Sequence, residues 1–174
     1  MVRVVIDLVD FNDYVRDNDG NRYLLNCIDS FSQFTWSFAL DNREAETIHK
    51  CIVQEIFSRF GYPKILQSDN GGEFIGHTMR DALQRKGVKI IHSSPYHPET
   101  NGRVERFNRT VEGQLGKLME ELNTRRWIDL LEDVTNGYNY TRHSTTNRPP
   151  FELMFARKPS MQWYRMEELQ NLTG

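Results

Sequence analysis

A run of β-branched and other apolar residues, VRVVIDLV at residues 2–9, most constrains how this chain can fold. Such a run predicts a buried strand, and it carries Asp7 near its end. A polar, turn-rich stretch follows, after which RYLLNCID (22–29) and QFTWSFAL (33–40) predict two more strands joined by a tight Ser-rich turn. The three strands together predict an antiparallel meander.

Apolar periodicity predicts a helix after the meander, with Asp41 or Asn42 as its N-cap. Its apolar positions recur every four residues and are Ile48, Ile52, Ile56 and Phe60. PKILQSD (63–69) predicts a short strand, a helix spans 78–86, and VKIIHS (88–93) predicts a fifth strand. This order, β-β-β-α-β-α-β followed by helices, predicts an α/β fold: a mixed sheet with helices on both faces.

Helical periodicity dominates the rest of the chain. A long helix is expected from Asn101, then a second helix, then a last short one within RPPFELMFARKP (148–159), where two prolines break the pattern. Residues 1–159 are expected to form one domain, with 160–174 as a peripheral C-terminal tail. The apolar stripe of the long helix consists of Val104, Phe107, Val111, Leu115, Leu118 and Leu122, and that of the second helix of Trp127, Leu130, Leu131, Val134 and Tyr138.

Composition narrows the functional classes. Lys plus Arg number 22 and Asp plus Glu 24, a net charge of −2, which does not indicate a nucleic-acid binder because basic groups supply most affinity for phosphate. Cys27 and Cys51 are too few for a disulfide framework or a zinc site, and we expect buried, reduced thiols in an intracellular protein. The sequence has no run of about 18 apolar residues, so no membrane partner is expected.

Three acids fall where the predicted elements can bring them together. Asp7 and Asp69 lie at the carboxyl ends of predicted strands, where open α/β sheets bind ligands, and they face each other if those strands are neighbours. Glu105 lies about 100° around its helix from Val104, so it borders the buried stripe and can lean over the sheet edge. The residues on its side of the helix are Asn101, Asn108 and Glu112.

Three carboxylates held close together repel one another unless a cation joins them. Hard oxygen ligands favour Mg²⁺ or Mn²⁺ over zinc. Two such ions about 4 Å apart can clamp an in-line phosphoryl displacement, where they activate the attacking oxygen and stabilise the leaving one.

Each acid also has an ordinary interpretation when taken alone. A single Asp at a strand end is usually a turn or cap residue, and DNGG (69–72) can be only a turn. Glu105 can simply pair with Arg109 four residues later, a surface contact of about 0.3–0.5 kcal/mol. Their joint spacing favours the shared site.

That spacing carries a family resemblance. Asp69 and Glu105 are separated by 35 residues, HPETNG (97–102) precedes the glutamate, and IDLVD (6–10) contains Asp7. Together these resemble the catalytic core of retroviral and gypsy-type LTR retrotransposon integrases, whose pattern is Asp, Asp, 35 residues, Glu. The resemblance covers residues 2–159 and includes YLLNCIDSFSQFTWSFAL, SDNGGEF, YHPETNGRVERFNRT and YNYTRHSTTNRPPFELMFARKP. It departs at Ala156, where relatives often carry glycine.

The resemblance implies an RNase H-like fold, a five-stranded mixed sheet between helices that forms a homodimer. It implies that Asp7, Asp69 and Glu105 are the catalytic residues and the ligands of Mg²⁺ or Mn²⁺, as two ions. Its expected partner is DNA, both element ends and target DNA, and no small-molecule substrate is expected. Three nearby acids rank lower: Asp10, Asp29 and Glu73.

The resemblance also implies which residues contact DNA. Tyr96, Asn101 and Asn108 are expected near the processed DNA end, and Gly72 with Glu73 near target DNA. Asn70, Arg103 and Arg109 complete the expected DNA-binding set, the two arginines belonging, with Arg106, to a local basic patch beside Glu105.

Three functions compete on this basis. The first is a metal-dependent polynucleotidyl transferase of the nucleus, an integrase-type nucleotidyltransferase and endonuclease that carries out DNA 3′-end processing and strand transfer. The second is a domesticated, host-encoded relative that serves as a dimerisation or DNA-binding module without catalysis, which the slightly acidic composition permits. The third is an RNase H-like nuclease or transposase of another branch, which HPETNGRVERFN (97–108) disfavours. Whether the source is an active element or a captured gene stays open.

Overall fold

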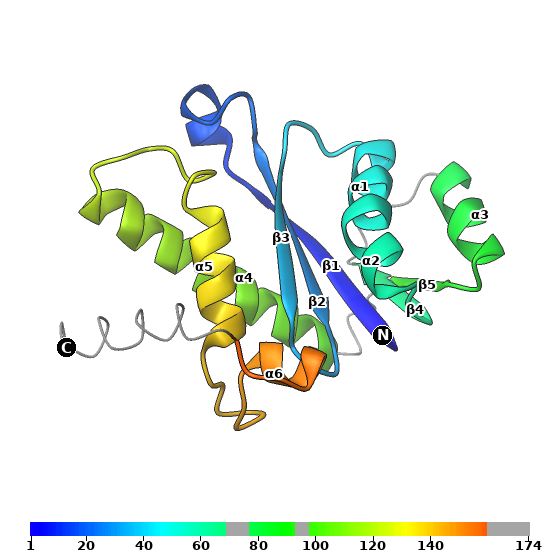
Figure 1. Cartoon of the computed structure of the whole chain (residues 1–174). Helices are drawn as coiled ribbons and strands as arrows, with labels where there is room; N and C mark the ends of the chain where they lie inside the picture. The colour runs from blue at the N-terminus through cyan, green and yellow to red at the C-terminus, as the bar shows by residue number, and fades with distance from the viewer. Residues whose placement is uncertain (69–76, 93–97, 160–174) are drawn as a thin grey trace.

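A computed structural model describes residues 1–68, 77–92 and 98–159, and in it five strands form one mixed sheet in the order β3-β2-β1-β4-β5 (Figure 1). The meander β1-β2-β3 is antiparallel, whereas β4 runs parallel to β1 and β5 parallel to β4. The predicted meander and mixed sheet are therefore confirmed. The strands are β1 (Arg3–Asp10), β2 (Tyr23–Asp29), β3 (Thr35–Leu40), β4 (Ile65–Ser68) and β5 (Lys89–His92).

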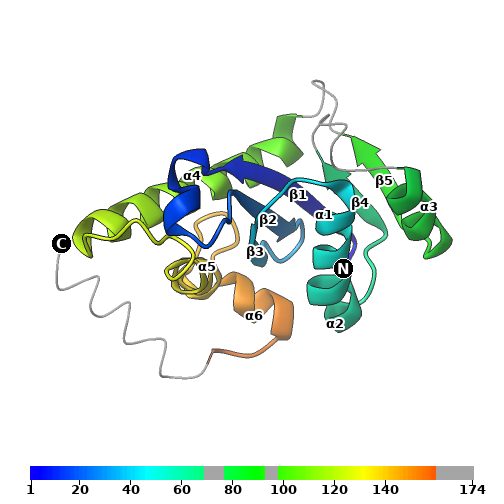
Figure 2. The same ribbon diagram turned by 90° about the horizontal axis from the view of Figure 1, so that it is seen from above.

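Helices cover both faces of this sheet, and Figure 2 shows the longest of them, α4, running beside β1. The helical segments are η1 (Asn12–Asp17, 3₁₀), α1 (Ala45–Cys51), η2 (Ile52–Phe57, π), α2 (Ser58–Phe60), α3 (His77–Arg85), α4 (Pro98–Glu121), α5 (Leu131–Tyr140) and α6 (Pro150–Phe155). Within the described ranges, no helix has the length and apolar character needed to cross a membrane.

Strand alternation divides the core between the two faces. Val4 and Ile6 of β1 pack with α1, η2 and α3, whereas Val5 packs with Val104 of α4. β2 alternates in the same way, because Leu25 belongs to the α1 cluster and its neighbour Leu24 to the α4–α5 cluster. Odd-numbered residues of β1 therefore face α4, and Asp7 is one of them.

The first helix is continuous from α1 through η2 to α2, and its middle turn is π-helical. Apolar residues spaced four apart gradually rotate around an α-helix, which has 3.6 residues per turn. A π turn holds more residues, so it brings these side chains back onto one face. Ile48, Ile52 and Ile56 are consequently all fully buried. The predicted N-cap is wrong: Glu44 is the N-cap, because Asn42 Oδ1 accepts the Glu44 N–H at 2.9 Å and forms a turn just before the helix.

The apolar stripes of the later helices differ from prediction at their ends. α4 ends at Glu121, so Leu122 is 61% exposed and Met119 closes the buried stripe. α5 begins only at Leu131, and the fully buried Trp127 therefore precedes it.

A polar clasp holds the connection from α4 to α5 against η1. The buried amide of Asn18 donates to the carbonyl oxygens of Tyr14 (2.7 Å) and Arg125 (2.9 Å), and its oxygen accepts the Ile128 N–H (3.2 Å). The bonds to Arg125 and Ile128 join two segments more than 100 residues apart, so the far end of α4 is fixed to the β1–β2 connection.

Ala156, the departure noted in the sequence, lies at the C-cap of α6 with φ +53°, in the left-handed region. A Cβ atom destabilises this conformation, which explains why glycine suits the position. The departure thus concerns a helix end and lies outside the predicted acid cluster.

We therefore expect Ala156→Gly to raise the free energy of unfolding by about 0.5–1 kcal/mol, since relief of the left-handed strain outweighs the extra flexibility of glycine. Urea denaturation measures it. The matched control is Ala82→Gly inside α3, which should lower stability by about 1 kcal/mol. Equal destabilisation by both substitutions would contradict the left-handed conformation of Ala156.

Candidate active site

A row of polar side chains crosses the sheet on the face covered by α4. Asp7 of β1 pairs with Asn26 of β2, and Asn26 pairs with Ser37 of β3. Ser37 Oγ donates to Asn26 Oδ1 at 2.7 Å. The row interrupts an apolar surface, since Leu24 and Ile28 flank Asn26 on the same face.

Asn108 of α4 joins this row to the helix. Its Nδ2 donates to Asp7 Oδ2 at 2.6 Å, and its Oδ1 accepts from Asn26 Nδ2 at 2.8 Å. Asn26 is fully buried and Asn108 is 8% exposed, so these bonds are shielded from water. Helical periodicity places Asn108 here, because Phe107 and Val111 beside it anchor α4 in the core.

Glu105 lies on α4 one turn before Asn108, on a neighbouring side of the helix. Its side chain is 57% exposed, and Arg109 Nη2 lies 3.9 Å from Glu105 Oε2. The i,i+4 pair anticipated as the ordinary interpretation is therefore present, in an exposed and loose form.

Several predicted site residues lie outside the part of the chain that the structure describes. These are Asp69, Asn70, Gly72, Glu73 and Tyr96. Asn101 and Arg103 belong to α4, but their side chains are likewise outside the described set. Their predicted roles stay predictions.

The two lower-ranked acids that the structure describes have other partners. Arg22 Nε and Nη2 donate to Asp10 at 2.9 and 2.7 Å, and this hydrogen-bonded guanidinium lowers the pKa of the Asp10 carboxyl. Asp29 pairs with Val4 at the opposite end of β2 and on the opposite face from Asn26. Its Oδ2 accepts the backbone N–H (2.8 Å) and the hydroxyl (2.7 Å) of Ser32, so it holds the β2–β3 turn.

The carboxyl end of β4 lies beside β1 and carries a second polar cluster. Ser68, its last residue, is fully buried, and its Oγ is 3.5 Å from His92 Nδ1 on β5. His92 Nε2 is 3.1 Å from Arg80 Nη2 of α3.

Sequence reasoning missed Asn26 and Ser37. Asn26 did leave a signal, because it is the one amide in the otherwise apolar run YLLNC. Its connection to Asp7 needs the strand register, which a single sequence does not fix.

The donor set around Asp7 suits a hard divalent cation. Asp7 is half-buried, and both of its carboxylate oxygens accept hydrogen bonds: Oδ2 accepts from Asn108 Nδ2 at 2.6 Å and Oδ1 accepts the Leu8 N–H at 3.0 Å. Among residues 1–68, 77–92 and 98–159, no three His, Cys, Asp or Glu side chains form a metal-binding group. A cation site at Asp7 would therefore need further carboxylates beside it.

Comparison with protein families decides what kind of protein this is. A family model described as integrase core domain matches residues 3–98, and a second one of the same description matches residues 86–150. The chain belongs to the integrase core domain family. This family comprises enzymes of the polynucleotidyl transferase kind, and the predicted resemblance is confirmed.

A curated relative places this integrase core among retroviral proteins. The Gag-Pol polyprotein of woolly monkey sarcoma virus is 39% identical over 123 residues, which are 71% of this chain and 7% of the polyprotein. The chain thus spans a small part of its curated relative. It is an integrase core of retroviral origin, consistent with DNA integration.

Solved integrase structures share the fold. A chain of the simian T-cell lymphotropic virus intasome in complex with PP2A regulatory subunit B56 gamma aligns with a TM-score of 0.75 at 16% identity, over 92% of this chain and 55% of that one. The HTLV-2 integrase catalytic core domain in complex with magnesium, in its trimeric form, aligns with a TM-score of 0.69 at 16% identity, over 88% and 95%. The predicted RNase H-like fold is confirmed.

The Asp10–Arg22 pair predicts a pH-dependent contribution to stability. Because the folded-state pKa of Asp10 is lowered from 3.8, the contribution is present above that value and is lost as pH falls through the lowered pKa. For this exposed pair we expect Arg22→Gln to lower the free energy of unfolding slightly at about pH 5.5 and by less at about pH 2.5. Urea denaturation at both pH values measures it, with Arg16→Gln as the control. An equal loss at both pH values would exclude the carboxylate.

Proposed function

We propose that this integrase core is a Mg²⁺- or Mn²⁺-dependent polynucleotidyl transferase that processes DNA 3′ ends and transfers them to target DNA. The observation that carries the proposal is the Asp7 carboxylate, held by Asn108 on the sheet face that α4 covers. A carboxylate oriented in this way on a central strand is a prepared metal ligand.

The strand register supports Asp69 as the second ligand. β1 pairs with β4 from Arg3–Ile65 to Val5–Gln67, an offset of 62 residues, and the same offset relates 7 to 69.

The position of α4 supports Glu105 as the third ligand. Glu105 precedes Asn108 by three residues, and Asn108 contacts Asp7 directly. Its pairing with Arg109 is long and exposed, so a change of rotamer can release the carboxylate toward the sheet.

In the proposed reaction a water attacks a phosphodiester near the DNA 3′ end, and the freed 3′-hydroxyl then attacks a target phosphodiester. Bound divalent ions supply activation of the attacking oxygen and stabilisation of the leaving one. Asp7, Asp69 and Glu105 hold the ions, and Asn108 orients Asp7. The protein itself thus contributes position and charge.

The solvent side of α4 supports DNA as the substrate. Arg109 is 78% exposed, and Arg106 lines a hollow of about 180 Å³ together with Thr110 and His143. Both arginines neighbour Glu105 along α4, and cations in this position can neutralise DNA phosphates. DNA as partner and the nucleus as location belong to this proposal.

Metal binding and strand transfer test the enzyme. Isothermal titration with Mn²⁺ should show binding that Asp69→Asn abolishes. Loss of a residue that only hydrogen-bonds to a metal ligand typically costs about 10–100-fold in activity. Glu105→Gln should reduce strand transfer by more than this, because it removes a ligand itself. Glu120→Gln, an exposed acid on the same helix, is the control.

Metal binding without strand transfer would instead favour the non-catalytic module. The net charge of −2 is compatible with that module. Absence of metal binding would remove the enzyme proposal.

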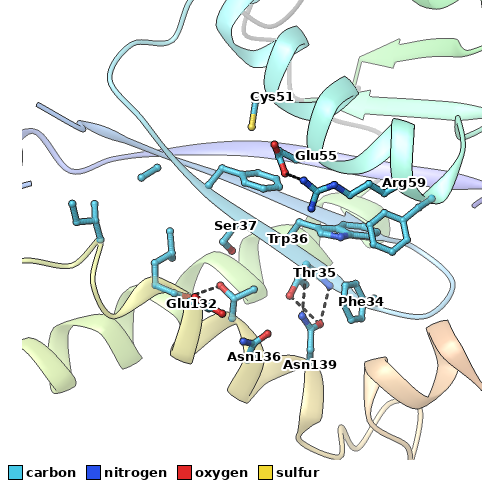
Figure 3. A pocket seen from close by; sticks show the side chains of 16 residues that line it. Phe34, Thr35, Trp36, Ser37, Cys51, Glu55, Arg59, Glu132, Asn136 and Asn139 are labelled. Carbon is cyan, nitrogen blue, oxygen red and sulfur yellow. Dashed lines mark hydrogen bonds and ion pairs between the residues drawn. The ribbon is translucent and has the colours of Figure 1, made fainter. Parts of the chain in front are cut away.

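A groove at the edge strand β3 supports self-association as part of the function (Figure 3). It has a volume of about 680 Å³, and β3 lies on its floor between the first helix and α5. One wall carries Glu55 and Arg59, which pair at 2.6 Å, and the other carries Glu132. With both signs of charge around an apolar floor, the surface can complement a second copy of itself. The solved relatives are described as an intasome and a trimeric form.

Asn136→Arg tests this homodimer. Asn136 is half-buried on α5 and lines the groove, so a long cationic side chain there should shift the protein to monomer without unfolding it. Light scattering after gel filtration measures the mass. Asp133→Arg, on an exposed position of the same helix outside the groove, should leave the mass unchanged. A wild-type monomer at the highest soluble concentration would contradict the proposal.

A further inference from the structure

We infer that Asn26 and Ser37 are positioning residues for the active site, which act on Asp7 through Asn108. The inference rests on the proposed function, because it assigns a role to residues that do not themselves touch metal or DNA. Three consecutive hydrogen bonds carry it: Ser37 to Asn26, Asn26 to Asn108, and Asn108 to Asp7. We call this chain of four side chains the polar relay.

The direction of the polar relay is fixed at the Asp7 end. An ionised carboxylate only accepts hydrogen bonds, so Asn108 must present its NH₂ group to it. The Asn108 oxygen then faces Asn26 and requires a donor there, which turns the NH₂ group of Asn26 toward Asn108. The remaining oxygen of Asn26 requires a donor in turn, and the Ser37 hydroxyl supplies it.

Reversal of the Asn108 amide breaks the polar relay at two places. A turned Asn108 would place its oxygen against the Asp7 carboxylate and its NH₂ group against the NH₂ group of Asn26. Both amides are buried, so water does not compensate for the lost bonds. Aligned bonds of this kind also polarise and strengthen one another. Asn26 therefore keeps Asn108 in its donor orientation.

The strand register makes the polar relay rigid. Asp7, Asn26 and Ser37 are direct partners across three neighbouring strands, so backbone ladders hold their Cα atoms on both sides of Asn26. Asn108 approaches from α4, whose neighbouring side chain Phe107 is in the core. The Asp7 carboxylate is thus fixed by a helix and by two further strands.

A purely structural role makes a different prediction. If Asn26 only satisfied its neighbours, its removal would lower stability and leave the properties of Asp7 unchanged. If it positions Asp7, its removal weakens cation binding beyond the effect of an equally destabilising change elsewhere. Asn139 of α5 is a matched control position, because it is also a buried asparagine. It exchanges hydrogen bonds with Thr35 of β3, the edge strand that also carries Ser37.

The test compares Asn26→Leu with Asn139→Leu in the whole chain. Leucine is close to asparagine in size and removes every polar atom of the side chain. Mn²⁺ affinity, measured by titration, should fall about 10-fold in Asn26→Leu and change little in Asn139→Leu. The side-chain ¹H–¹⁵N signals of Asn108, recorded without metal, should lose their protection from exchange in Asn26→Leu alone.

A milder series guards against a variant that does not fold. Ser37→Ala should weaken Mn²⁺ binding in the same direction by a smaller factor, because it leaves the Asn26 oxygen without its donor. Ser37→Thr keeps the hydroxyl and should restore wild-type affinity.

The outcomes separate the inference from the proposed function. Unchanged Asn108 signals in Asn26→Leu would overturn the polar relay. Changed signals with a fall in affinity no larger than in Asn139→Leu would overturn the positioning role. A wild type that binds no Mn²⁺ would overturn the proposed function and the positioning role with it, while the metal-free signals would still report on the relay.

Discussion

The acceptor-only character of the Asp7 carboxylate is the constraint on which the rest of the site depends. Asp7 lies on β1, whose backbone groups pair with β2 on one side and β4 on the other. One donor to its side chain is the backbone N–H of Leu8, and α4 brings a second one through Asn108. A half-buried acid on a central strand thus requires a polar helix face exactly where the core would otherwise be apolar.

Core packing and site geometry are coupled through α4. Phe107, Val111 and Leu115 anchor one side of the helix in the cluster shared with α5. Asn108 and Glu105 lie beside that stripe, so rotation of the helix would move both relative to Asp7. The Asn18 clasp fixes the connection beyond its C-terminal end. A change that loosens the packing of α4 against α5 should therefore also disturb the orientation of the Asp7 carboxylate.

The sequence predicted the elements well where the signal was local. All five strands and the order of the helices followed from apolar runs and periodicity. The N-cap at Glu44 and the exposure of Leu122 were not predicted, because each depends on where a turn or a helix stops. The ends of helices are set by side-chain and backbone hydrogen bonds that compete for the same terminal groups.

The site shows the same division between local and tertiary information. Asp7 was predicted as a site residue because it was expected at a strand end, although β1 continues past it to Asp10. The roles of Asn26 and Ser37 depend instead on three strands being in register. An amide inside an apolar strand signals that something polar opposes it, but it does not identify the partner. The bond from Asn26 to Asn108 spans 82 residues and needs the packed helix as well.

Net charge does not describe where charges lie. Part of the acidic surplus lies around η1, where Arg22 pairs with Asp10 and Arg126 pairs with both Asp19 and Asp129. Arg106 and Arg109 of α4 lie instead beside the site. DNA affinity depends on the phosphates that nearby cations neutralise, and a bound divalent ion adds its own charge at the same place. A core of net charge −2 can therefore present a locally positive surface where the proposed substrate must bind.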